Sequence, residues 1–273
     1  MWMVIGLAAA VLAQAAEPDR AAAKPYGLPL RGDDAEAFLR AAQIVERKSI
    51  STGITHPQQV TLRDGVRTLR GVWKTIDESR QGVTPMEGGG FQVDFRDTYK
   101  FEIAAYELDK LIGLDLVPPT VERQIKDEHG SLQLWVEGVM TEYQRIKEKI
   151  EVSDPENWNE QIYKVRLMHQ LTYDTDYNNA ANLLVDPAFR IYAIDFSRAF
   201  RKYDALLSEK DLTRFSRSAL EGLRRLDRAV LEEKLGHWLT RHEITALLKR
   251  RDMILALAER RVAEKGEGAV LYP

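Results

Sequence analysis

Three polar residues, Asp176, Asn182 and Asp195, surround two short apolar strands expected within the segment YDTDYNNAANLLVDPAFRIYAIDFSRAF, residues 173–200. Asn182 directly precedes the strand at 183–185, and Asp195 follows the next strand. Side chains at the ends of adjacent strands converge, and Mg²⁺ and Mn²⁺ prefer carboxylate and amide oxygens as ligands. We interpret the segment as a site that holds a divalent metal against a phosphate, with an ordinary hairpin and polar turns as the alternative.

Two upstream charged residues complete the groups that phosphoryl transfer needs. Lys74 ends the strand expected within GVWKTI, where its ammonium group would bind nucleotide phosphates. Glu102 lies on a downstream helix that could bring it to the lysine. Each has an ordinary alternative, because a lysine at a strand end and a glutamate on a helix are usually solvated. Arg198 is a second candidate partner for the carboxylate of Asp195.

The segments FEIAAYELDKLIGLDLVPPTVER, HQLTYDTDYNNAANLLV and YAIDFSRAF resemble the atypical kinases grouped around the secretory-pathway casein and xylose kinases. The chain is more distantly similar to HipA-type and phosphatidylinositol kinases. The resemblance covers about residues 44–200, and its most specific part is a Glu-bearing helix followed by Leu-Gly and a double proline. It implies an α+β, two-lobed protein-kinase-like fold with a strand-rich N-lobe and a mainly helical C-lobe.

The resemblance also implies ATP and Mg²⁺ or Mn²⁺ as cofactors, and a partner that carries an acceptor hydroxyl on a protein, a sugar or a lipid. In this pattern Lys74 is the nucleotide-phosphate lysine, and Glu102 is its helix partner or an additional metal ligand. Asp176 is the catalytic carboxylate that orients the acceptor hydroxyl, and Asn182 and Asp195 are the metal ligands.

Two further nucleotide contacts are assigned by position within the resemblance. The segment SISTGITHPQQV, with Gly53 in its turn, takes the place of the loop that covers the phosphates. Residues 136–139 take the place of the adenine-binding hinge, with Glu137 and Val139 as its expected contacts.

The sequence departs from the family pattern in the spacing of the catalytic loop. Six positions separate Asp176 from Asn182, whereas the protein-kinase pattern has five. An alternative register, Asp174 with Asn179, restores five. We prefer Asn182, because it directly precedes the strand.

Two substitutions favour a second interpretation of the chain. Tyr177 stands where a basic residue commonly follows the catalytic aspartate, and Ser197 stands where glycine is usual. The first removes a charge near the γ-phosphate, and the second restricts the backbone. The alternative function is therefore a catalytically inactive pseudokinase that acts as a nucleotide-binding or regulatory module.

Composition limits the partners and the compartment. The chain has 273 residues, a formal net charge of −3 and no cysteine; it lacks the basic field of a nucleic-acid-binding protein and any thiol chemistry. Its N-terminal apolar stretch is too short to span a membrane and ends in a cleavage-like Ala-Gln-Ala. We expect an exported, periplasmic or secreted protein if this signal peptide is genuine, and otherwise a cytoplasmic one.

The elements expected to position these residues change character along the chain. We expect a possible signal peptide at 1–15, a linker at 16–34, the N-lobe at 35–138 and the C-lobe at 139–273. Apolar periodicity predicts helices at 33–48, 98–113 and 158–172, and several more between 205 and 265. Alternation predicts a hairpin over 58–74, two strands on either side of a turn at 126–130, and the strands of the opening segment. The glycines at 88–90 are interpreted as a flexible insertion.

Overall fold

The computed structural model describes residues 26–50, 57–85 and 91–273, so the expected signal peptide and Gly53 lie outside the described residues. The helices are α1 (Gly32–Ala41), α2 (Tyr99–Ile112), α3 (Glu142–Lys147), α4 (Pro155–Thr172), α5 (Arg217–Arg225), α6 (Arg228–Leu235), α7 (Arg241–Lys265) and α8 (Glu267–Val270), with short 3-10 turns η1 (Ala180–Asn182) and η2 (Glu209–Asp211). The strands are β1 (Gln43–Ser49), β2 (Gln58–Arg63), β3 (Thr68–Lys74), β4 (Asp77–Pro85), β5 (Phe91–Thr98), β6 (Thr120–Ile125), β7 (Glu128–Leu134), β8 (Met140–Thr141), β9 (Leu183–Val185), β10 (Ile191–Ala193), β11 (Phe215–Ser216) and β12 (Leu271–Tyr272).

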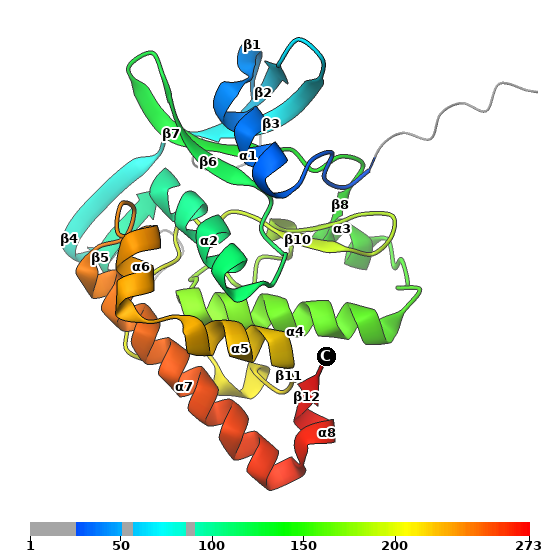
Figure 1. Ribbon diagram of the computed structural model, residues 1–273, viewed down its shortest axis with the longest axis vertical. Helices are drawn as coiled ribbons and strands as arrows, with labels where there is room; N and C mark the ends of the chain where they lie inside the picture. Colours follow the sequence, from blue (N-terminus) through cyan, green and yellow to red (C-terminus); the bar gives the residue numbers. More distant parts are fainter. Residues whose placement is uncertain (1–25, 51–56, 86–90) are drawn as a thin grey trace, which may run out of the picture.

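The first half of the chain forms a five-stranded sheet in the order β1-β2-β3-β7-β6, with α1 lying across it (Figure 1). Its core is small and consists of apolar residues from α1 and from alternate positions of the strands. Val60 and Leu62 of β2 are fully buried, as the alternation in the sequence predicts. Phe38 and Leu39 of α1 pack against them. This sheet carries Lys74 at the end of β3.

The helix expected at 33–48 was wrong in its second half. Helix α1 ends at Ala41, and residues 43–49 form the edge strand β1, which pairs antiparallel with β2. Val45 is 44% exposed in this strand, so its helical spacing from Phe38 was fortuitous. The β-branched pair Ile44-Val45 fits a strand better than the centre of a helix, because branching restricts the side-chain rotamers there.

A hairpin of β4 and β5 stands between β3 and α2, and the sequence patterns did not predict it. The two strands form their own antiparallel sheet, with a register shift between Arg80 and Val83. Val83, Phe91 and Val93 are exposed on this hairpin. The alternation of buried apolar and exposed polar residues that usually indicates a strand is therefore weak here. The glycines at 88–90 lie outside the described residues.

Helix α2 joins the two halves, and both of its ends follow the sequence. The hydroxyl of Thr98 accepts the N–H of Lys100 at the N-terminus, and Gly113 ends the helix with a left-handed φ of 82°, which glycine adopts without strain. Apolar residues along α2 pack into the large core shared with α4, β9, β10 and α5–α7. Glu102 and Asp109 are buried on the same helix, at 2% and 3% exposure.

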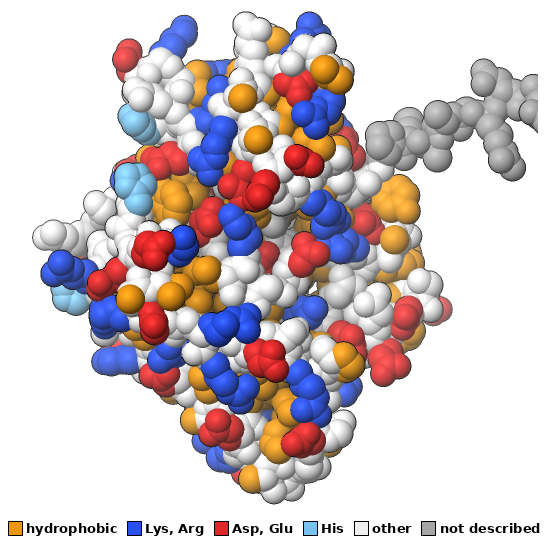
Figure 2. Space-filling model, in the orientation of Figure 1, with side chains coloured by type: hydrophobic (Ala, Val, Ile, Leu, Met, Phe, Trp, Pro, Cys, Tyr) orange, Lys and Arg blue, Asp and Glu red, His pale blue; other side chains and the backbone are white. Residues whose placement is uncertain are grey.

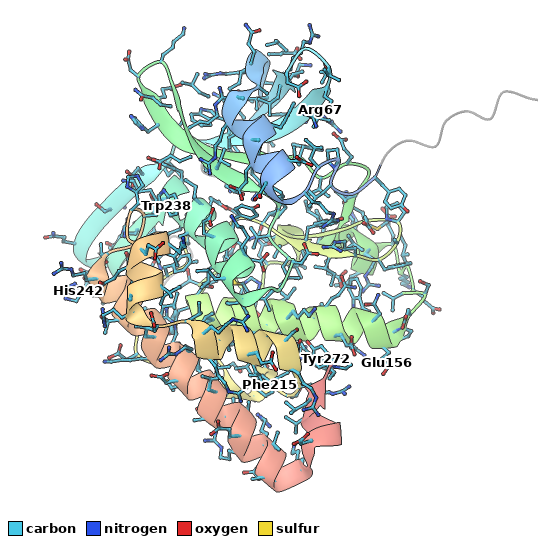
Figure 3. The ribbon with its side chains drawn as sticks, in the orientation of Figure 1. Arg67, Glu156, Phe215, Trp238, His242 and Tyr272 are labelled. Atoms are coloured by element: carbon cyan, nitrogen blue, oxygen red, sulfur yellow. The ribbon has the colours of Figure 1, made fainter. Side chains whose placement is uncertain are left out.

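The second half is helical around α4 and α7, and the small antiparallel sheet β10-β9-β8 lies between α4 and the five-stranded sheet in the view of Figure 1. Asp154 caps α4 by accepting the N–H groups of Glu156 and Asn157, and Pro155 occupies the first turn, where its missing N–H costs nothing. Trp238, labelled in Figure 3, follows α6 and donates from Nε1 to Glu122 of β6 at 3.0 Å. That bond ties the helical half to the five-stranded sheet.

Two observations concern the surface. Within residues 26–50, 57–85 and 91–273, no helix has the length and apolar character needed to cross a bilayer. Positive and negative side chains are interspersed over the face shown in Figure 2.

Asp109 is expected to make stability depend on pH. Its Oδ2 accepts the N–H groups of Leu116 and Val117, each at 3.1 Å, but burial outweighs these bonds and raises its pKa from 3.8 to about 7. The native state then keeps a proton that the unfolded chain releases. The stabilisation is complete below about pH 4 and is lost as the pH rises through about 7.

We expect the wild-type unfolding free energy to fall over this range by up to about 1.4 kcal/mol per pH unit from this group. Asp109→Asn should remove that part of the slope, because it cannot titrate, whereas the exposed-turn variant Asp127→Asn should keep it. Urea titrations at a series of pH values measure the difference. If the unfolding free energies of the wild type and of Asp109→Asn depend on pH with the same slope, the raised pKa assigned to Asp109 is wrong.

Candidate active site

Lys74, Glu102 and Asp195 form one ion-pair cluster, although 121 positions separate its outermost members. Lys74 Nζ lies 2.5 Å from Glu102 Oε1 and 2.7 Å from Asp195 Oδ1. The Lys74 and Glu102 side chains are only 12% and 3% exposed, whereas that of Asp195 is 39% exposed. The cluster carries one cation and two carboxylates, so one negative charge is left without a neutralising partner inside it.

The electrostatics of the cluster follow from this excess of carboxylate. Burial would lower the pKa of Lys74, but the charges of Glu102 and Asp195 outweigh burial and raise it, so the ammonium stays protonated. Burial raises the pKa of Glu102 despite the nearby lysine. The charge of Lys74 lowers the pKa of Asp195, which keeps that carboxylate ionised at neutral pH.

Asp195 is held in an unusual backbone conformation directly after β10. Its φ is 67°, in the left-handed region that residues other than Gly, Asn and Asp rarely adopt. The next N–H, from Phe196, donates to Glu102 Oε2 at 3.1 Å. Glu102 therefore fixes both the lysine and the backbone beside Asp195. Strained residues of this kind occur preferentially at functional sites.

The loop after α4 is organised by a buried histidine-aspartate pair. His169 Nδ1 lies 2.9 Å from Asp174 Oδ2, and Asp174 Oδ1 accepts the N–H of Asp176 at 3.0 Å. The His169 ring also stacks on Phe196, with ring centroids 5.8 Å apart. Asp174 is 1% exposed, and both of its oxygens are occupied in holding the loop.

Asp176 and Asn182 meet at the far end of this loop. Asp176 Oδ2 accepts from Asn182 Nδ2 at 2.9 Å and from Asn179 Nδ2 at 3.0 Å. Asn179 is exposed, and its own oxygen accepts the N–H of Ala181, so both ends of its amide are used. Asn182 is 8% exposed. Because its nitrogen faces Asp176, its Oδ1 is left as a possible ligand oxygen.

The backbone brings Asn182 to the segment that carries Asp195. The N–H of Ile194 donates to the carbonyl of Asn182 at 2.9 Å. Asp195 Oδ and Asn182 Oδ1 are both hard oxygens of the kind that suits Mg²⁺ or Mn²⁺. Among the described residues there is no group of three or more His, Cys, Asp or Glu side chains that could hold a metal ion alone. A donor pair of this size fits a metal whose remaining ligands are phosphate oxygens and water.

The expected hinge residues join the two halves, but Glu137 is already engaged. Its backbone N–H and C=O both bond to Gly27, at 2.9 and 2.7 Å, and its carboxylate accepts Arg70 Nε at 3.0 Å. Val139 is half-buried in the same segment. The N–H of Glu137 is therefore not free to donate to a ligand, whereas its carbonyl oxygen keeps a second lone pair.

A cavity of about 410 Å³ opens beside Asp176. Aromatic residues form much of its lining, which consists of Phe91, Gln92, Tyr173, Thr175, Asp176, Arg198, Tyr203 and Leu207. Arg198 Nε bonds to Asp97 at 2.8 Å; it is not the direct partner of Asp195, whose salt bridge is to Lys74.

Sequence reasoning missed the role of His169, considered Asp174 only as an alternative catalytic aspartate, and did not place Arg198 beside Asp176. The available signal for the first two was a histidine five positions before an aspartate, at a helix end that leads into the polar loop. Arg198 was noted only as an alternative partner for Asp195. The hairpin that supplies Asp97 and Phe91 was not predicted, and so the wall it forms was missed.

The order of the elements and the ion-pair cluster together define the class of fold. A strand-rich first half carries a lysine paired with a helix glutamate, and a helical second half carries an Asp/Asn loop and an aspartate after a strand. This is the arrangement of a protein-kinase-like fold.

Comparison with solved structures supports that class. Fam20 of hydra, solved with a sugar, superposes with a TM-score of 0.61 at 16% identity, covering 87% of this chain and 90% of the other. A Golgi casein kinase superposes with a TM-score of 0.59 at 15% identity, covering 88% of this chain and 78% of the other. The Helicobacter pylori proinflammatory kinase CtkA superposes with a TM-score of 0.50 at 11% identity, covering 83% of this chain and 98% of the other. The chain therefore has the atypical kinase fold predicted from its resemblance to the casein and xylose kinases.

Comparison by sequence gives no further relatives. No family model matches the chain, and no curated protein does either.

Proposed function

We propose that this protein is an atypical kinase that transfers the γ-phosphoryl group of ATP to a hydroxyl group, using Mg²⁺ or Mn²⁺. The observation that carries the proposal is the Lys74–Glu102–Asp195 cluster, in which a buried ammonium is held by two carboxylates and one of these is left 39% exposed. An excess negative charge next to a buried cation suits a metal–phosphate pair better than a purely structural salt bridge. A structural ion pair would be neutral, because an unpaired buried charge is costly.

Each residue has a role that its contacts support. Lys74 would bind the nucleotide phosphates while Glu102 holds it in place, and Asp195 and Asn182 would bind the metal, which neutralises charge on the transferred group. Asp176 would orient the acceptor hydroxyl, since it lines the open cavity whereas Asp174 is buried and fully engaged. These contacts favour the register Asp176/Asn182 over Asp174/Asn179.

Arg198 would supply the positive charge that Tyr177 does not. Its guanidinium lines the cavity beside Asp176. Burial alone would lower its pKa, but hydrogen bonding to Asp97 and the charges of Asp176 and Asp195 raise it, so it stays charged. A cation supplied from the turn after Asp195 could stabilise charge on the phosphoryl group in the transition state.

The acceptor is the least defined part of the proposal. The solved structures of similar fold include one with a sugar and one named as a casein kinase, so a sugar hydroxyl and a protein hydroxyl are the two classes to test first. The cavity beside Asp176 is where either would bind.

A second candidate function, a nucleotide-binding pseudokinase, is favoured by Tyr177 and Ser197. The backbone at Ser197 is part of the fold, because its carbonyl accepts the N–H of Thr98 at 3.0 Å. The pseudokinase would bind ATP without turnover.

Nucleotide binding is tested by thermal shift of the full chain with ATP and with ADP, each with and without Mg²⁺ or Mn²⁺. A ligand that binds only the native state raises its stability, by about 2.7 kcal/mol at a hundredfold excess over Kd. We expect metal-dependent stabilisation by both nucleotides. No shift at millimolar nucleotide would contradict both candidate functions, whereas a shift without any phosphoryl transfer would select the pseudokinase.

A further inference from the structure

A second cavity, of about 470 Å³, lies apart from the ion-pair cluster and shares none of its residues. It is formed where the N-terminal segment before α1 meets the loop after α2, the start of α4 and the turn between β9 and β10, which Figure 1 shows close together. Its charged lining residues are Arg31, Lys164, Arg190, Asp115 and Asp186. A cavity of this size accommodates a small organic molecule.

The geometry of the cavity is fixed by polar contacts at its floor. Asp186, 4% exposed, accepts the N–H groups of Ala188 and Arg190 and the hydroxyl of Tyr192. Gly27, at φ 75°, packs so closely that a Cβ there would lie 2.9 Å from the Tyr192 hydroxyl. Asp186 is therefore a structural carboxylate whose two oxygens both accept hydrogen bonds. These bonds and the close packing of Gly27 fix the shape of the cavity.

The remaining charges favour an anion. Arg31 and Arg190 both bond to Asp115, whose side chain is 69% exposed. Lys164 has no salt-bridge partner in the described part of the chain, and Arg190 Nε is buried there without a hydrogen-bond partner. Three cations thus line the cavity with two carboxylates, those of Asp115 and Asp186, which leaves one positive charge in excess. Because Lys164 has no counter-charge of its own among the described residues, the lining attracts an anion.

We propose that this cavity binds the phosphate group of a small molecule. Two guanidinium groups and an ammonium are the donors that recognise a phosphate dianion. The carboxylate of Asp115 now bridges the two arginines, as an external anion would. Because exposed ion pairs contribute little, about 0–1 kcal/mol, a dianion can compete with Asp115 for them. The phosphate can be inorganic or belong to a small organic ester whose remainder fills the cavity.

Isothermal titration calorimetry of the full chain with inorganic phosphate, glucose 6-phosphate and glucose tests the proposal. We expect both phosphates to bind and glucose not to bind, with glucose 6-phosphate the tighter ligand if the source is an organic ester. Lys164→Gln should weaken binding by about tenfold or more, through loss of one charge-assisted hydrogen bond. Arg166→Gln, an exposed cation on the same helix α4, is the matched control and should leave the affinity unchanged.

Asp115→Asn gives an independent test in the opposite direction. Removing the competing carboxylate should tighten phosphate binding several-fold, and a loss of stability cannot imitate a gain in affinity. The proposal is overturned if neither phosphate binds at millimolar concentration, if glucose binds as well as glucose 6-phosphate, or if Lys164→Gln and Arg166→Gln have equal effects. These results are independent of nucleotide binding, because the cavity contains no residue of the ion-pair cluster.

Discussion

Replacing Asp195 with alanine is expected to abolish metal-dependent stabilisation by ATP while leaving the chain folded. Asp195 is one of only two residues proposed to bind the metal, and its carboxylate is 39% exposed, so little buried structure depends on it. Lys74 keeps its 2.5 Å bond to Glu102 in the variant. We expect the affinity for metal–nucleotide to fall by about a hundredfold or more, as for loss of a charged group at a buried site. Thermal shift and calorimetry with MnATP measure the loss.

Two further variants separate metal binding from backbone strain. Alanine is disfavoured at the φ of 67° that Asp195 adopts, whereas asparagine tolerates it. Asp195→Asn should therefore keep native stability and still lose most metal-dependent binding. Asp204→Ala removes an exposed aspartate that pairs with Lys249, and it should bind nucleotide as the wild type does. If Asp195→Asn binds MnATP as tightly as the wild type does, the assignment of Asp195 as a metal ligand is wrong.

Replacing Asp176 with asparagine should eliminate phosphoryl transfer but preserve nucleotide binding. The carboxylate accepts hydrogen bonds from Asn179 and Asn182 and lines the cavity proposed for the acceptor. Positioned carboxylates of this kind contribute about 10²–10⁴-fold to the rate. Transfer of label from γ-labelled ATP to casein and to a sugar acceptor measures the effect.

The control for this variant is Asp127→Asn, the same chemical change in the exposed turn between β6 and β7. It should transfer phosphate at the wild-type rate. Equal activity of Asp176→Asn and wild type would contradict the role of Asp176. If the wild type also transfers no phosphate although it binds ATP, the result would favour the pseudokinase function.

The sequence predicted those parts of the fold whose local signals agree with their tertiary packing. Helix α2 has a threonine cap, an apolar stripe and a terminal glycine, and the β2–β3 hairpin has Asp64-Gly65 between alternating strands. Local signals failed where a strand buries few of its side chains. Strands β1 and β4 are mostly exposed, so neither shows a clear apolar period. Strand β5 buries polar as well as apolar residues, which hides its alternation.

The candidate site was predictable in its residue types but not in its contacts. Chain order pointed to Lys74, Glu102 and Asp195, yet no spacing rule shows that one lysine would bond to both carboxylates. The register of the catalytic loop was also open, because Asp174 and Asp176 are both plausible in a turn. Only burial and hydrogen-bond partners distinguish the engaged Asp174 from the available Asp176.

The most direct test of the central claim is to locate the metal. Crystals grown with Mn²⁺ and a non-hydrolysable ATP analogue give an anomalous signal at the manganese absorption edge. We predict a manganese peak bound by Asp195 and Asn182, with the nucleotide phosphates between it and Lys74. A nucleotide bound elsewhere, or a manganese peak away from Asp195, would contradict the account.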